Sequence, residues 1–114
     1  MLTPEQNILS CLEKNTNSKY NHAMRWRVLF KKSVRKKLLK LPRSILQALA
    51  ALAADIENGG PVRGDWPNYS RLSPNRHHCH LKKGRPTYVA VWEEERDEVL
   101  VEVIYVGTHE DAPY

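Results

Sequence analysis

The sequence predicts an α+β fold in which a helical hairpin packs on one face of a mainly antiparallel four-stranded sheet, in the order β-α-α-β-β-β. Three observations lead to this prediction: an alternating apolar segment near residue 26, two consecutive stretches with helical apolar spacing, and three strand-like segments after residue 76. Helices that come early and a strand meander that comes late are typical of one sheet covered by helices. The 114 residues fit a single domain, which we place at residues 25–114.

The first strand is predicted where Trp26, Val28 and Phe30 alternate with Arg27 and Leu29. Side chains on successive strand residues point to opposite faces, so this alternation indicates a half-buried strand.

Two neighbouring helices are predicted next, because apolar residues recur every three or four positions, and in the first helix basic residues occupy the other face. The apolar residues of the first helix, which follows an N-cap at Ser33, are Val34, Leu38, Leu39 and Leu41. The apolar residues of the second helix are Ile45, Leu46, Leu49, Leu52, Ala53 and Ile56. Pro42 separates the helices, and the run Asn58–Pro61 ends the second one. We expect both apolar faces to pack on the sheet, near Val101 and Val103.

Three more strands are predicted in the second half of the chain. Residues 77–83 form the first of them, and the run 84–86 (Gly-Arg-Pro) is the turn that follows. Residues 87–92 form the next strand, the acidic run 93–98 is a hairpin tip, and residues 99–106 form the last strand.

Basic and acidic residues are segregated along the chain, whose net charge is +5. Residues 25–43 contain nine Lys or Arg and no acid, and residues 71–85 contain five more with three histidines, again without an acid. Two such stretches favour contact with a polyanion, whereas a single one is more often a solvated helix face.

The targeting features point to the cytoplasm. Residues 1–24 are predicted to be an extension outside the domain, and they contain no apolar signal-peptide core. The longest largely apolar run, residues 44–54, is too short to span a membrane. Cys11 and Cys79 are the only cysteines, so a disulfide framework is not expected.

Histidines supply the candidate chemistry. Strand alternation places His78, His80 and Lys82 on one exposed face if Cys79 faces the core. A second signal is Gly107-Thr108-His109, because Gly107 permits a sharp exit and so places His109 just past the strand end, at the sheet rim. RNA cleavage needs a base for the 2′-hydroxyl, an acid for the leaving 5′-oxygen and cations around the phosphorane. The alternative is a zinc site on His78, His80 and His109.

The segment from Trp26 to Tyr114 resembles the RelE/YafQ/HigB toxins of bacterial toxin–antitoxin systems, within the RelE/ParE superfamily. The resemblance depends on the strand-helix-helix opening, the loop of residues 64–69 (Gly-Asp-Trp-Pro-Asn-Tyr), the Cys79-His80 strand, and the closing run 107–109 (Gly-Thr-His). An acidic residue that follows the strand histidine in YafQ-like members has no counterpart here.

The resemblance implies a RelE-like fold and cleavage of mRNA at the ribosome without metal or cofactor. It also implies a cognate antitoxin as partner, and we expect the free toxin to be a monomer. The expected catalytic residues are His80, His109, Arg85, His78 and Tyr114. The expected RNA- or phosphate-binding residues are Lys82, Lys83 and Arg71.

Two other functions stay open at this point. A ParE-like toxin would inhibit DNA gyrase and would lack the histidine pair. A non-catalytic basic RNA-binding module would carry exposed aromatics for base stacking, whereas Tyr88 and Trp92 are at strand positions that favour the core.

Overall fold

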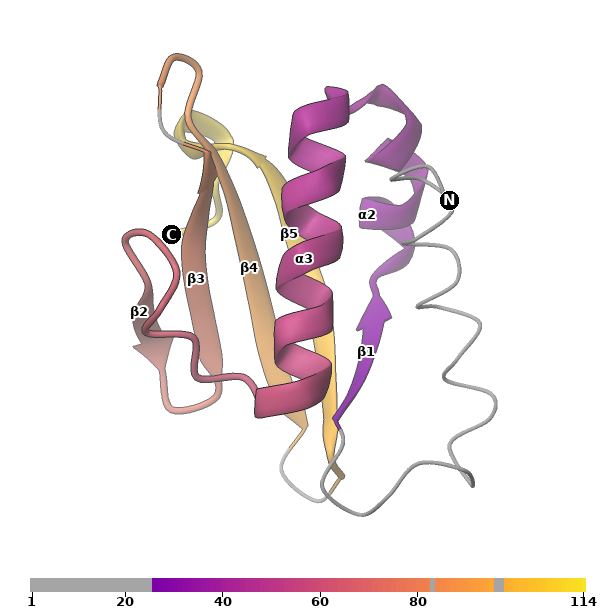
Figure 1. Cartoon of the computed structure of the whole chain (residues 1–114), viewed down its shortest axis with the longest axis vertical. Coiled ribbons are helices and arrows are strands. Elements are labelled where there is room, and N and C mark those ends of the chain that lie inside the picture. The colour runs from indigo at the N-terminus through magenta and orange to yellow at the C-terminus, as the bar shows by residue number, and fades with distance from the viewer. Residues whose placement is uncertain (1–25, 83, 96–97) are drawn as a thin grey trace.

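A computed structural model describes residues 26–82, 84–95 and 98–114 (Figure 1). The expected extension at residues 1–24 and the expected phosphate ligand Lys83 lie outside these residues. The elements in chain order are β1 (Arg27–Phe30), α2 (Lys32–Lys37), the 3-10 turn η2 (Leu38–Lys40), α3 (Arg43–Gly59), β2 (Ser70–Ser73), β3 (Arg76–Lys82), β4 (Tyr88–Glu95), β5 (Leu100–Thr108) and the 3-10 turn η3 (His109–Asp111).

The strands form one sheet in the order β1-β5-β4-β3-β2, in which β1 runs parallel to β5 and the other pairs are antiparallel. The predicted α+β class and helix-strand order are therefore confirmed, but the sheet has five strands rather than four. The extra strand β2 was missed because it has no alternation of apolar and polar residues. It forms by pairing with β3, at the edge of the sheet.

Helix α3 supplies most of the core on one face of the sheet. The six apolar residues predicted for this helix are all buried in one cluster that also contains Val34, Leu38, Val101 and Val103. The helix begins directly after Pro42 and ends at Gly59; the next residue, Gly60, has a φ of +92°, which favours glycine. Within the residues that the structure describes, no helix has the length and apolarity needed to cross a bilayer.

The first helix differs from its prediction. Helix α2 ends at Lys37, and the chain tightens into the 3-10 turn η2 before it becomes extended at Leu41. This change rotates the side chains, so Leu38 is buried while Leu39 is 83% exposed. The expectation that Leu39 belongs to the apolar face was wrong.

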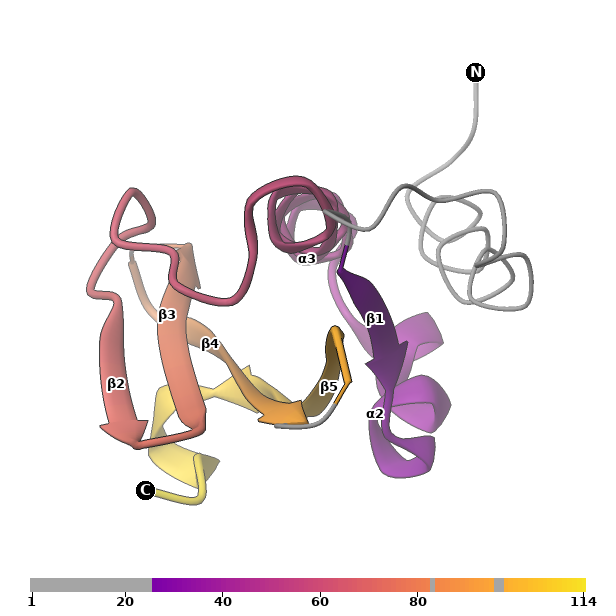
Figure 2. The same cartoon turned by 90° about the horizontal axis from the view of Figure 1, so that it is seen from below.

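The two faces of the sheet carry different residues. On β3 and β4, His77, Cys79 and Trp92 lie on the face covered by α3, and all three are fully buried. His77 bonds there through Nδ1 to Tyr69 Oη (2.7 Å) and through Nε2 to Glu94 Oε2 (2.6 Å). Figure 2 shows that the C-terminal segment lies on the opposite face.

Candidate functional site

The site lies on the sheet face opposite α3. Strand β3 presents His78 and His80 on this face, because Cys79 between them points into the core. The expected alternation is thus confirmed for both histidines. Their partners across the β3–β4 pairing are Val91 and Val89, which are fully buried yet lie outside the main core cluster. The two valines give the site a rigid apolar base.

The end of β5 brings His109 to the same place. The backbone N–H of His109 donates to Thr87 O (2.8 Å), and the Tyr105 hydroxyl donates to Thr108 O (2.7 Å). A Cβ atom at Gly107 would lie 2.6 Å from Tyr105 Oη. Glycine is therefore needed here for the close approach of the Tyr105 ring, and not for the sharp exit expected from the sequence, because β5 continues through Thr108.

Four of the five expected catalytic side chains form one cluster. The ring centroids of His80 and His109 are 5.6 Å apart, and those of His78 and His80 are 6.1 Å apart. Tyr114 lies 4.6 Å from the His78 ring and 5.9 Å from the His109 ring. His78 is only 8% exposed and bonds through Nδ1 to Ser70 Oγ (2.9 Å). These contacts place His78 beneath the cluster, with His80 and His109 at its surface.

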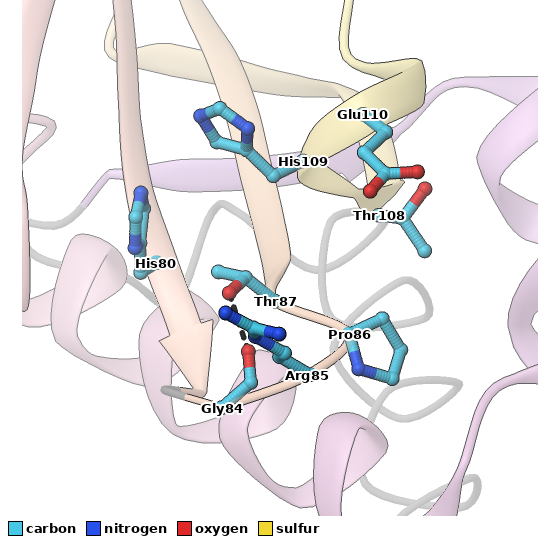
Figure 3. Close-up of a pocket in the computed structure, with 8 residues that line it drawn as sticks. All are labelled: His80, Gly84, Arg85, Pro86, Thr87, Thr108, His109 and Glu110. Atoms are coloured by element: carbon cyan, nitrogen blue, oxygen red, sulfur yellow. Dashed lines mark hydrogen bonds between the residues drawn. The ribbon is translucent and has the colours of Figure 1, made fainter.

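The fifth expected residue, Arg85, lines an open cleft of about 820 Å³ together with His80 and His109. Figure 3 shows its guanidinium on the β3–β4 turn below His80, where the Thr87 hydroxyl donates to Gly84 O (2.6 Å). The residues that line the cleft are His80, Gly84, Arg85, Pro86, Thr87, Thr108, His109 and Glu110. A cation and two imidazoles therefore line one cavity that is open to solvent.

The surroundings lower the pKa of two histidines. Burial lowers the pKa of His80, and the neighbouring His109 and His78 lower it further because a second positive charge nearby is unfavourable. The pKa of His78 is also lowered, mainly by burial. Burial raises the pKa of the Tyr114 hydroxyl, with smaller effects from Tyr105 and Cys79. At neutral pH the His80 ring is therefore neutral and can accept a proton.

Two of the expected phosphate-binding residues lie away from this cleft. Arg71 pairs with His77 across the β2–β3 ladder, so it lies on the α3 side of the sheet. The β3–β4 register shifts between His80 and Lys82, and Lys82 pairs with Tyr88. This shift places Lys82 away from the sheet face that carries His78 and His80.

Several residues that position the site have no signal in the sequence. Ser70 is on the unpredicted strand β2, and Tyr105 was seen only as part of a strand. Glu110 follows His109 in the sequence and had no predicted role, but it lines the cleft. Among the described residues, no group of three or more His, Cys, Asp or Glu side chains is placed to hold a metal ion. The zinc alternative therefore has no support from this geometry.

Comparisons with known proteins identify the fold. No protein-family model matches the chain, and no curated protein sequence matches it. A mutant of the E. coli toxin RelE in the free state superposes with a TM-score of 0.62 at 20% identity, covering 78% of this chain and 88% of that one. A chain of the archaeal RelE–RelB complex from Pyrococcus horikoshii OT3 gives 0.58 at 15% identity, covering 78% and 100%. The chain therefore has the RelE-like fold that the sequence motifs indicated.

Proposed function

We propose that this chain, which has the fold of RelE toxins, is the toxin of a toxin–antitoxin pair and an endoribonuclease that cleaves mRNA at the ribosome. The observation that carries the proposal is the pair His80 and His109, 5.6 Å apart in a cleft that Arg85 also lines. A fold by itself does not define an activity, whereas this site has the residue types that RNA cleavage needs.

The chemistry is a transesterification at phosphorus, from the 5′-oxygen to the 2′-oxygen, with two proton transfers. Neutral His80 accepts the proton of the 2′-hydroxyl while the 2′-oxygen attacks phosphorus. The bond from phosphorus to the 5′-oxygen breaks, and His109 in its protonated form donates a proton to that leaving oxygen. The products are a 2′,3′-cyclic phosphate and a 5′-hydroxyl. Arg85 stabilises the negative charge that develops on the phosphorane. No step needs a metal ion.

His78 and Tyr114 have supporting roles in this proposal. His78 lies between Ser70 and the Tyr114 ring, so it holds the tyrosine against His109. The Tyr114 ring is about half exposed and offers a surface for a base of the RNA.

The proposed partners are an antitoxin, mRNA and the ribosome, in the cytoplasm. One of the structures with this fold is a complex of RelE with RelB. The exposed basic residues of α2 and η2 surround the exposed Leu39, a surface that suits an acidic, amphipathic antitoxin segment. Association with such a segment should slow as salt is raised, because charge attraction is screened.

The test is controlled expression of the full chain, followed by mapping of new mRNA 5′ ends. His80→Ala and His109→Ala should each reduce ribosome-dependent cleavage by about 10²- to 10⁴-fold. Arg85→Ala should reduce it by about 10²- to 10³-fold. Arg71→Ala is the matched control, because it removes the same charge from the other face of the sheet and should leave cleavage unchanged.

Circular dichroism must show that each variant is folded. A folded His109→Ala variant that cuts at the wild-type rate would refute the mechanism. Growth arrest by the wild type without new 5′ ends would instead favour a ParE-like gyrase inhibitor.

A further inference from the structure

A second cavity of about 320 Å³ adjoins the cleft across the β3–β4 turn. It shares three lining residues with the cleft, Gly84, Arg85 and Pro86, and otherwise lies between this turn and the beginning of α3. The residues that line it, among those that the structure describes, are Pro42, Ser44, Ile45, Lys82, Gly84, Arg85, Pro86 and Tyr88. None of them is acidic, and the volume is at the lower end of the range of about 300–1,000 Å³ for small-ligand sites.

Two cationic side chains line this cavity. Lys82 is the last residue of β3 and is exposed, and Arg85 is exposed on the turn. Neither makes an ion pair with any residue in the described part of the chain. Both charges are therefore available to an anion from solvent.

The register shift in β3 explains how one strand serves two cavities. His80 pairs with Val89 on the face of the catalytic cleft, whereas Lys82 pairs with Tyr88, whose ring packs against the α3 side of the core. Without the shift, Lys82 would lie on the His80 face, because residues two apart in a regular strand share a face. Among the cations in the described part of the chain, Arg85 is the one that lines both cavities.

We propose that the second cavity binds the phosphodiester next to the one that is cut, so that the RNA strand crosses the Gly84–Pro86 turn from one cavity to the other. Lys82 and Arg85 hold this neighbouring phosphate, and the Tyr88 ring forms an aromatic wall for the attached nucleoside. This inference depends on the proposed function, because it extends the path of the same substrate. An exposed cation that contacts a phosphate adds affinity but takes no part in proton transfer.

The experiment measures binding of a short single-stranded RNA that carries a 2′-deoxynucleotide at the scissile position and so cannot be cleaved. In a series of such oligomers, one phosphate at a time is replaced by a neutral methylphosphonate. Wild-type affinity, from fluorescence anisotropy, should fall about two- to five-fold when the phosphate beside the scissile one is neutral. The Lys82→Ala variant should bind the unmodified RNA more weakly. At that position it should lose less affinity than the wild type, because only the Arg85 contact remains there.

Two controls separate this site from general charge effects. Lys40→Ala removes one positive charge from η2 and should keep the wild-type response to every methylphosphonate. Lys82→Arg keeps the charge and should retain the wild-type affinity. The slope of log Kd against log salt should fall by about 0.7 in Lys82→Ala, the value for one phosphate contact on a single strand.

Because binding is measured without cleavage, the two proposals fail separately. Cleavage that depends on His80 and His109, with Lys82→Ala binding like the wild type, would overturn the second cavity alone. Loss of affinity at every methylphosphonate position alike, or no binding of the wild type, would overturn it as well. A position-specific loss in a protein that does not cleave RNA would support the binding path and refute the catalytic proposal.

Discussion

Replacing Gly107 with alanine places a methyl group against the ring that holds the end of β5. The new Cβ would lie 2.6 Å from Tyr105 Oη and 2.9 Å from Tyr105 Cζ, both too short for any carbon contact. The Tyr105 hydroxyl also donates the hydrogen bond to Thr108 O, so the side chain cannot move away without losing that bond. His109 follows Thr108 directly, and its position therefore depends on the Tyr105 contact.

The expected loss of unfolding free energy follows from these contacts. Overpacking a fitted site costs about 1–3 kcal/mol of unfolding free energy. Tyr105→Phe removes only the hydroxyl, and a lost hydrogen bond costs about 0.5–1.5 kcal/mol. The phenylalanine ring keeps its place near Lys37 Nζ, which lies 5.6 Å from the ring centroid. In the double variant the 2.6 Å contact with Oη is absent, and the hydrogen bond is lost only once. The loss of unfolding free energy in the double variant should therefore be about 0.5–1.5 kcal/mol smaller than the sum of the losses in the two single variants.

The assay is urea unfolding of the two single variants and the double variant, with cleavage rates measured in parallel. Gly64→Ala is the matched control, because no atom lies within 4 Å of a Cβ at that position. It should be neutral, or stabilising by about 0.4–1 kcal/mol through the unfolded chain. Strict additivity of Gly107→Ala and Tyr105→Phe would refute the argument that both act on one contact. A Gly107→Ala variant with full cleavage would show that Tyr105 does not position His109.

Three further predictions follow from burial and charge. Because the pKa of His80 is lowered, the loss of kcat/KM on acidification should begin below the usual histidine value of about 6.5, and a pH–rate profile with a limb above that value would contradict its role as base. Burial also lowers the pKa of His77, so near pH 6.5 the unfolded chain binds more protons than the folded chain. The free energy of unfolding should therefore decrease as pH falls below that value. In His77→Leu the urea midpoint should decrease less over the same pH range. Leu49→Ala should cost about 2–5 kcal/mol in urea unfolding, whereas Leu39→Ala should stay within about 0.5 kcal/mol, because Leu49 is fully buried and Leu39 is 83% exposed.

Much of the site could be predicted because it depends on alternation within one strand. His78 and His80 share a face whenever residues 77–82 are extended and Cys79 is buried, so their common orientation follows from local geometry. The apolar spacing of α3 similarly determined which of its side chains enter the core. The position of His109 could be predicted from the end of a strand. The close approach of Tyr105 to Gly107 could not be predicted, because it depends on the tertiary structure.

The remaining features depend on which strands pair and in which register, and this is settled by contacts between residues far apart in the chain. Strand β2 exists because β3 offers it an edge, and it brings Ser70 to His78. A shift of one residue in the β3–β4 pairing sends Lys82 to a different cavity from His80. Local sequence pattern thus specifies four of the five strands, most of the helix residues that enter the core, and the residue types that are present at the site. The shared cleft of the two histidines and Arg85, and the absence of Arg71 from it, depend on sheet order and register, which arise from packing between residues far apart in the chain.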